Sequence, residues 1–258
     1  MNTLFTVCGR AGSKGVSNKN CREFLGVPLV FYTLAAVELY YERHIGDTIH
    51  LCLNTDSDDL ISQVRRWCSN INTVPRVSEL AGDLSAKLPV IKDSLCKMEN
   101  THGIYYDCVV DLDISSPLRT VDNVAAAIEK QQYGSFDVVF SAAKARRSPY
   151  FNMVKQNADG SCEKVIQSEF TVRQQVPALY DMNASIYAYK PEFLRKNTSG
   201  MLFDGKCAFI VVPDTGVLDI DSEQDFIHLE AIVPFFKSHD ASLSEVFDLA
   251  QKRVRLKG

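Results

Sequence analysis

Short apolar runs alternate along the chain with longer segments in which apolar residues recur at helical spacing, and this alternation constrains the fold more than any other feature. It is typical of β/α units, in which strands form a mostly parallel sheet and helices cover its faces. We expect strands at residues 3–8, 48–54, 72–75, 108–112, 137–141, 184–189 and 208–212. We expect helices at residues 29–42, 58–69, 88–100, 121–131, 222–236 and 242–253. The pattern therefore predicts an α/β fold.

The alternation of apolar runs and helix-period segments stops between residues 142 and 182. Proline, asparagine, aspartate and glycine interrupt the helical period there and leave only short β-like pieces around Met153 and Val165. Elsewhere the chain has no linker of low complexity and no internal repeat. We therefore expect a single domain over residues 1–258, with an inserted β-rich arm at residues 142–182.

The composition limits which partners the protein can bind and indicates the cellular compartment in which it is found. With 258 residues, 46% of them hydrophobic, the chain can bury a full core, and a net charge of -4 gives no basic field for nucleic acid. The eight cysteines are scattered without a C-x-x-C pair, which argues against zinc and favours free thiols in a reducing cytoplasm. Arg10 comes too early for a signal peptide, and no apolar run approaches the ~18 residues of a membrane span. We expect a cytoplasmic protein that contacts neither nucleic acid nor membrane.

A basic, glycine-containing loop follows the first predicted strand directly. Its glycines free the backbone to point amides inward, and anions bind at such positions at the carboxyl end of a strand. The loop matches neither the Walker pattern nor the dinucleotide fingerprint, so the alternative is an ordinary turn with solvated lysines. It comprises Gly9, Arg10, Ala11, Gly12, Ser13, Lys14 and Gly15, and Lys19 and Asn20 follow it.

Two carboxylates, Asp219 and Asp221, stand near the other end of the chain after an apolar run. Because side chains alternate in an extended chain, both are expected to project to one side of a strand end. Mg²⁺ prefers one or two carboxylates together with substrate phosphates, so the pair suits a nucleotide-bound Mg²⁺ or Mn²⁺. The alternative is that Asp221 caps the helix that follows. Asp111 and Asp113 form a similar pair, for which a turn and cap is again the alternative.

Six short motifs, in order along the chain, resemble those of the acylneuraminate cytidylyltransferases. They lie at residues 10–20, 54–56, 76–83, 116–119, 183–187 and 219–221. Within that family, the segments at residues 87–90, 111–113, 147–152 and 180–185 are more similar to bacterial CMP-legionaminic acid synthetases. Sialic acid enzymes usually have glutamine where this chain has Asp113, and serine where it has Lys87.

This resemblance implies a Rossmann-like fold of the nucleotide-diphospho-sugar transferase type, with the inserted arm exchanged in a homodimer. It also implies that CTP and a nine-carbon 2-keto sugar acid react to give CMP-sugar and pyrophosphate. Legionaminic acid or an N-acyl derivative is the favoured acceptor. Sialic or pseudaminic acid, the eight-carbon acid Kdo, and a catalytically inactive nucleotide-binding module remain alternatives.

The resemblance also implies roles for individual residues. Arg10 would stabilise the triphosphate, Asp219 and Asp221 would hold the metal, and Arg76 would help to recognise cytosine. The nucleotide contacts it implies are Gly9, Ala11, Gly12, Ser13, Lys14, Lys19, Asn20, Arg76 and Lys87. The sugar contacts it implies are Asp113, Ser115, Asn183, Tyr187 and Arg173, the last acting from a neighbouring subunit. Asn183 and Tyr187 could instead simply pair across a sheet, and Arg119, Arg146 and Arg147 are expected to be solvated or capping.

Overall fold

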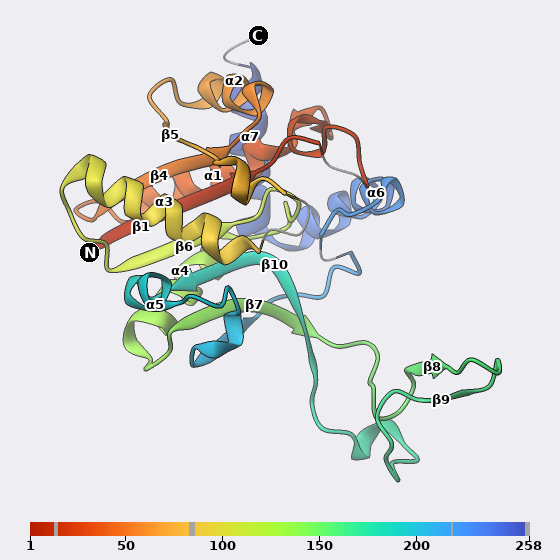
Figure 1. Cartoon of the computed structure of the whole chain (residues 1–258). Helices are drawn as coiled ribbons and strands as arrows, with labels where there is room; N and C mark the ends of the chain where they lie inside the picture. The colour runs from red at the N-terminus through yellow and green to blue at the C-terminus, as the bar shows by residue number, and fades with distance from the viewer. Residues whose placement is uncertain (13–14, 83–85, 218, 256–258) are drawn as a thin grey trace.

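The computed structural model describes residues 1–12, 15–82, 86–217 and 219–255, and is built around a seven-stranded sheet (Figure 1). The strand order is β11-β7-β10-β6-β1-β4-β5. The strands are β1 (Asn2–Gly9), β4 (Thr48–Thr55), β5 (Asn72–Pro75), β6 (Cys108–Leu112), β7 (Val138–Lys144), β10 (Tyr180–Tyr189) and β11 (Cys207–Val211). All neighbouring pairs are parallel except those of β10, which runs antiparallel to both β6 and β7. The mostly parallel sheet predicted from the sequence is confirmed.

Helices cover both faces of this sheet. α3 (Lys87–His102) and α5 (Pro191–Lys196) pack on one face, where Ile91, Leu95 and Leu194 are buried against strand residues. The other face carries α1 (Leu29–Arg43), α2 (Asp58–Trp67), α4 (Val121–Tyr133), α6 (Glu223–His239) and α7 (Ala241–Arg255). α1 is buried along most of its length because α7 covers it from outside, with the rings of Tyr32 and Phe247 4.4 Å apart. Apolar burial on both faces is the main stabilising term of such a layered fold.

The expected elements all occur, with shifts of a few residues at their ends. The strands expected at residues 72–75 and 108–112 match β5 and β6, and β10 begins four residues earlier than expected. The short helix α5 was not expected, because six residues are too few to show a helical period. A small hairpin of β2 (Glu23–Phe24) and β3 (Val27–Pro28) was also missed.

The chain between β7 and β10 forms an arm that projects from the body (Figure 1). Its regular structure is limited to β8 (Val154–Gln156), β9 (Cys162–Lys164) and a single 3-10 turn at Arg173–Gln175. These short strands lie at the β-like pieces expected near Met153 and Val165. Apolar side chains of the arm, including those of Met153 and Val154, are exposed.

Two further properties bear on the setting of the protein. All eight cysteines lie among the described residues and are free thiols, and Cys52 and Cys108 are fully buried. In the described part of the chain, no helix combines the length and the apolar character needed to cross a lipid bilayer.

Candidate functional site

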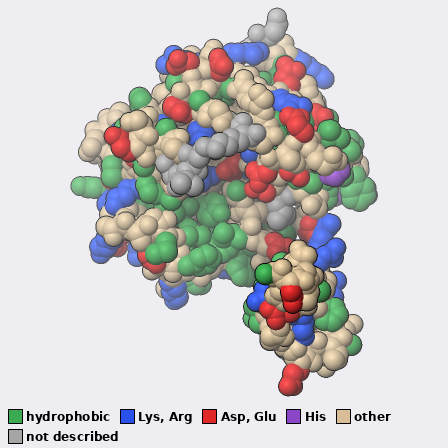
Figure 2. Space-filling model, turned by 45° about the vertical axis from the view of Figure 1, so that its right-hand side comes forward, with side chains coloured by type: hydrophobic (Ala, Val, Ile, Leu, Met, Phe, Trp, Pro, Cys, Tyr) green, Lys and Arg blue, Asp and Glu red, His purple; other side chains and the backbone are tan. Residues whose placement is uncertain are grey.

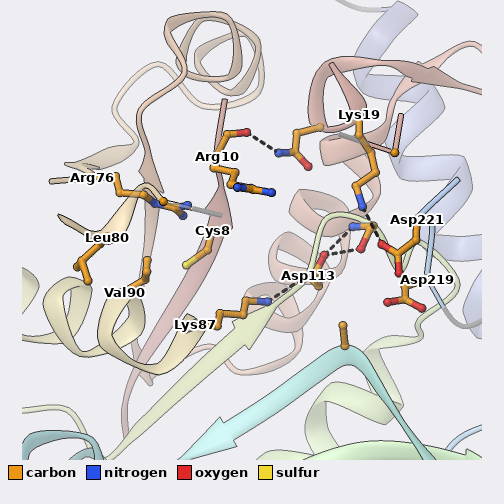
Figure 3. A pocket seen from close by; sticks show the side chains of 15 residues that line it. Cys8, Arg10, Lys19, Arg76, Leu80, Lys87, Val90, Asp113, Asp219 and Asp221 are labelled. Atoms are coloured by element: carbon orange, nitrogen blue, oxygen red, sulfur yellow. Dashed lines mark hydrogen bonds and ion pairs between the residues drawn. The ribbon is translucent and has the colours of Figure 1, made fainter. Parts of the chain in front are cut away.

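A cavity of about 410 Å³ opens where β1 and β6 end at the carboxyl edge of the sheet (Figure 3). This is the edge at which open α/β sheets bind ligands. Its lining comes from both ends of the chain and from several segments between them. The lining residues are Cys8, Arg10, Gly15, Lys19, Asn20, Arg76, Leu80, Gly82, Lys87, Val90, Asp113, Ser115, Ala184, Asp219 and Asp221.

The loop after β1 is held in place by contacts with three other segments. The backbone N–H of Ala11 donates to Oδ1 of Asp56 at 2.8 Å, and Nδ2 of Asn20 donates to the carbonyl of Arg10 at 3.2 Å. A Cβ at Gly15 would lie only 1.8 Å from the carbonyl oxygen of Asp221, so only glycine fits there. The loop therefore lies directly against the segment that carries the two predicted metal ligands.

The remaining loop residues shape the backbone. A Cβ at Gly9 would lie 2.4 Å from Cδ2 of Leu60, so Gly9 lets β1 pack against α2, whereas Gly12 has φ +71 and open space around it. Gly9, Ala11 and Gly12 thus form the loop without lining the cavity. The predicted residues Ser13 and Lys14 lie outside the described part of the chain.

Lys19 connects the loop region to the acidic segment. Its Nζ donates to the carbonyl of Ile220 and lies 3.4 Å from Oδ1 of Asp221. Burial raises the pKa of Asp219, and the neighbouring charges of Asp221 and Asp113 raise it further. The two carboxylates of this segment therefore repel each other, and a bound divalent cation would relieve that repulsion.

The pair fits a metal held partly by a substrate. Among the described residues there is no group of three or more histidine, cysteine, aspartate or glutamate side chains placed to hold an ion. The Asp221 side chain is 75% exposed and Asp219 is half-buried, and both face the cavity (Figure 3). Asp219 and Asp221 could supply two oxygen ligands, with phosphate and water completing the shell of a Mg²⁺ ion.

Two expectations about this segment were wrong. β11 ends at Val211, so Asp219 and Asp221 lie in the connection to α6 and not at a strand end. The cap of α6 is Ser222, whose Oγ accepts from the N–H of Asp225 at 3.2 Å, while Asp225 bonds back to the N–H of Ser222. This reciprocal capping box satisfies the helix end and leaves Asp221 available to the cavity.

At the opposite side of the cavity, Arg76 lies beside an apolar patch. Its Nε donates to Oδ1 of Asn54 at 3.0 Å and its Nη2 to the Asn54 carbonyl at 3.1 Å, which fixes the guanidinium. Leu80, Val90 and Cys8 line the cavity next to it (Figure 3). The sequence gives no signal that Leu80 and Val90 line a site, because an apolar residue in a β/α unit looks like a core residue. Burial raises the pKa of the Cys8 thiol well above its usual range, so it is a packing residue and not a thiolate.

Lys87, Asp111 and Asp113 form an ion triad on the floor of the cavity. Nζ of Lys87 lies 2.6 Å from Oδ2 of Asp111 and 2.7 Å from Oδ2 of Asp113. Burial opposes the charge of Lys87, but the two carboxylates outweigh it and raise the pKa of the ammonium well above its usual range. Burial likewise opposes the charge of Asp113, but Lys87 and Ser115 hold the pKa of that carboxyl well below its usual range. Lys87 and Asp113 are therefore both charged at neutral pH.

Arg119 is a supporting residue whose role differs from the expected one. Its side chain is 1% exposed, so it is neither solvated nor a surface cap. Its guanidinium donates to the carbonyl of Asp113 and, from Nε at 3.1 Å, to the carbonyl of Ser116. Burial lowers the pKa of Arg119 to about 10, which leaves it charged. The loop that carries Asp113 and Ser115 is thus fixed from behind.

Two predicted sugar contacts, Asn183 and Tyr187, lie in β10 outside the cavity lining. Oδ1 of Asn183 accepts hydrogen bonds from Oγ of Ser141 and from the N–H of Ser185. Asn183 therefore stabilises the part of β10 in which the register shifts. Tyr187 pairs with Asp111 across the sheet, and burial there raises the pKa of its hydroxyl. The neighbouring Ala184 does line the cavity.

Arg173 belongs to a different part of the molecule. It lies in the arm beside a second cavity of about 290 Å³, and its Nη2 donates to the carbonyl of Arg146 at 3.5 Å. Within one chain, Arg173 is therefore not part of the candidate site.

Comparison with known proteins identifies the class of protein first. The fold is shared with two solved structures, CMP:2-keto-3-deoxy-manno-octonic acid synthetase in complex with CTP and 4-diphosphocytidyl-2C-methyl-D-erythritol synthase from Anaerococcus prevotii DSM 20548. The first has a TM-score of 0.64 at 12% identity and covers 91% of this chain and 99% of its own. The second has a TM-score of 0.55 at 16% identity and covers 90% of this chain and 96% of its own. This chain therefore has the same overall fold as these two synthetases.

The family follows from the sequence comparisons. The cytidylyltransferase family model matches residues 5–257, so the chain belongs to the cytidylyltransferase family. A Campylobacter coli relative named post-translational flagellin modification protein B is 34% identical over 89% of this chain and 94% of its own. The CMP-N,N'-diacetyllegionaminic acid synthase of Campylobacter jejuni is 35% identical with the same coverage. The N-acylneuraminate cytidylyltransferase of Streptococcus agalactiae serotype III is 26% identical over 89% of this chain and 52% of its own.

Proposed function

We propose that this protein transfers the CMP group of CTP to the anomeric hydroxyl of a nine-carbon 2-keto sugar acid, releasing pyrophosphate. The observation that carries the proposal is the cavity itself. It brings the basic loop residues Arg10 and Lys19 together with the carboxylates Asp219 and Asp221, which lie about two hundred positions later in the chain. Cations for phosphates and oxygen ligands for a divalent ion are the two components that phosphoryl-type transfer requires.

The cavity offers a separate place for each part of the nucleotide. The apolar patch beside Arg76 is suited to the base, since a fixed guanidinium can donate to its polar edge. The triphosphate would lie along the loop, where the glycines allow close backbone approach and Arg10, Lys19 and Asn20 surround it. The predicted nucleotide contacts Ser13 and Lys14 belong to the same loop.

Asp219 and Asp221 would hold Mg²⁺ or Mn²⁺ together with the phosphates. When bound, such an ion neutralises charge on the phosphate oxygens and orients them for in-line displacement. Lys19, which contacts Asp221, would keep the acidic segment close to the loop and limit the repulsion between its carboxylates. The acceptor hydroxyl loses its proton to a cavity carboxylate or to solvent, and its oxygen bonds to the α-phosphorus as the bond to the pyrophosphate oxygen breaks.

Legionaminic acid or an N-acyl derivative is the acceptor that the relatives favour. Identity to the enzyme named for CMP-N,N'-diacetyllegionaminic acid is 35%, against 26% for a sialic acid enzyme and 24% for a pseudaminic acid enzyme. Asp113 and Ser115, which lie on the cavity floor, would contact this sugar. Asn183 and Tyr187 stand behind them, within or beside the sheet.

A homodimer is the assembly we propose for the working enzyme, in the cytoplasm where free thiols persist. The arm projects from the body, and hydrophobic side chains gather on the body beside it (Figure 2). Tyr180, Phe203 and Val211 are exposed at the same end of the sheet, and so are Met153 and Val154 of the arm. A second copy would cover these surfaces and could bring its Arg173 to the sugar.

The test is release of pyrophosphate by the purified protein with CTP, Mg²⁺ and a panel of acceptors. Legionaminic acid and its N,N'-diacetyl form, pseudaminic acid, sialic acid and Kdo should each be supplied separately. We expect release with the legionaminic acids above all others. Binding of CTP without release for any acceptor would instead identify an inactive nucleotide-binding module.

A further inference from the structure

The floor of the cavity holds one cation, Lys87, between the two carboxylates of Asp111 and Asp113. Nζ of Lys87 lies 2.6 Å from Oδ2 of Asp111, which is shielded from water, and 2.7 Å from Oδ2 of Asp113, which is partly exposed. Asp111 is fully buried, and its other oxygen accepts from Oγ1 of Thr6 at 2.8 Å. The ammonium of Lys87 is therefore bound to two carboxylate side chains at short range.

Asp113 is held more rigidly than any other carboxylate facing the cavity. Its Oδ1 accepts from both the N–H and the Oγ of Ser115, at 2.8 and 2.7 Å, and its Oδ2 accepts from Lys87. Its carbonyl also accepts from Arg119 and from Oγ1 of Thr33. Contacts to both oxygens and to the backbone leave one orientation for this side chain.

The contacts also determine what Asp113 can still recognise. An ionised carboxylate has only acceptor sites, about four in all. Two donors from Ser115 and one from Lys87 use three of these sites, and the side chain keeps 22% of its surface exposed toward the cavity. About one acceptor site therefore remains for a ligand, and its direction is fixed.

We propose that Lys87 is a positioning residue of the acceptor-sugar site, which orients Asp113 so that its remaining acceptor site selects sugar acids presenting an O–H or N–H donor there. This role replaces the nucleotide contact expected for Lys87 and rests on the function proposed above. It also accounts for two departures from the sialic acid enzymes at once, because the residues at both positions, Lys87 and Asp113, contact each other directly. A neutral serine and glutamine would need no such pairing.

The proposal predicts that removing the ammonium affects the sugar and spares the nucleotide. Lys87→Met keeps the length of the side chain but leaves Asp113 without its fixed donor. Affinity for N,N'-diacetyllegionaminic acid, measured by titration calorimetry in the presence of CMP and Mg²⁺, should fall roughly 10- to 100-fold, as expected for a lost charged hydrogen bond. Affinity for CTP should stay within about threefold of the wild type, and Lys87→Arg should recover part of the sugar affinity.

Two controls separate positioning from general damage. Lys97→Met removes another lysine of α3 that pairs with a carboxylate, Asp93 at 2.8 Å, and should leave both affinities unchanged. Lys87→Met/Asp111→Asn also removes the buried charge that Lys87→Met strands, and this double variant should still lose sugar affinity selectively. In an Asp113→Asn background, adding Lys87→Met should weaken sugar binding no further, because the two residues act through one contact.

The possible outcomes distinguish this inference from the proposed function. A selective loss of sugar affinity with recovery by arginine supports the role of Lys87. A loss of CTP affinity, equal losses of both in the double variant, or no loss at all would each overturn it. A wild-type protein that binds none of the sugar acids and releases no pyrophosphate would instead overturn the proposed function, and the assignment of Lys87 with it.

Discussion

The cavity and the arm differ in how far their side chains are partnered within one chain. At the cavity, charged side chains are locked by partners, as Lys87 is by Asp111 and Asp113. In the arm and beside it, Met153, Val154 and Tyr180 remain exposed, and Arg173 lies apart from the cavity. The difference fits our proposals that one chain supplies a preorganised site for nucleotide and metal, and that a second chain covers the arm.

The largest effect should come from the acidic segment of the cavity. Asp221→Ala removes a proposed metal ligand on an exposed side chain, so activity should fall at least about a thousandfold while stability changes little. Pyrophosphate release and urea unfolding would measure the two effects. Asp248→Ala, at another exposed carboxylate remote from the cavity, is the matched control and should retain full activity. Retained activity in Asp221→Ala would place the metal elsewhere.

Alanine substitutions at two glycines, one in the cavity loop and one in the arm, should differ in their effect on activity. Gly15→Ala would place its Cβ 1.8 Å from the carbonyl of Asp221, so the loop must move and kcat/KM should fall roughly a hundredfold. Gly160→Ala in the arm has open space but a φ of +85, so it should cost about 1 kcal/mol of local strain and leave kcat unchanged. Steady-state kinetics of both variants would decide; equal activities would show that the loop is not held against Asp221.

The arm prediction concerns assembly. Val154→Glu introduces a charge on an exposed apolar side chain that we expect a partner chain to cover. Light scattering should show a shift from dimer to monomer, and activity should fall about tenfold at low protein concentration. A protein that is monomeric as wild type would contradict this part of the account.

Arginines from the two regions should differ in their contribution to stability. Arg119→Met strands the carbonyls of Asp113 and Ser116 in the interior and should lower the unfolding free energy by about 2–4 kcal/mol. Arg146→Met breaks only an exposed pair with Asp214 and should cost less than about 1 kcal/mol. Urea unfolding at neutral pH measures both, and comparable values would mean that the loop behind Asp113 is not fixed by Arg119.

The smallest effect is a pH dependence. Because its folded-state pKa is depressed, Asp113 contributes stability above its unfolded pKa, near 4, and loses that contribution as the pH falls through its lower folded-state pKa. The unfolding free energy should therefore decrease less between pH 5 and pH 3 in Asp113→Asn than in the wild type. Identical slopes in urea unfolding would show that Lys87 does not stabilise the charged carboxyl.

The sequence predicts the sheet and the helices well because the spacing of apolar residues reflects which side of each element is buried. It predicts the basic loop and the carboxylates Asp219 and Asp221 because their residue types are chemically distinctive. The sequence does not predict the role of a residue when that role depends on which side chains or backbone groups the residue contacts in the folded structure. Ser222 and Asp221 both precede a helix, and only the structure shows which one caps it. Lys87 and Asp113 are 26 positions apart, and Arg119 looks like a turn arginine until its burial is known. Leu80 and Val90 are indistinguishable from core residues in sequence.

The most direct test of the central claim is a crystal structure with CTP and Mn²⁺, with anomalous scattering used to locate the metal. The account predicts a manganese peak bound by Asp219 and Asp221, the triphosphate along the loop beside Arg10, and the base near Arg76. A metal or a triphosphate bound away from this cavity would contradict the claim that one cavity unites the two ends of the chain.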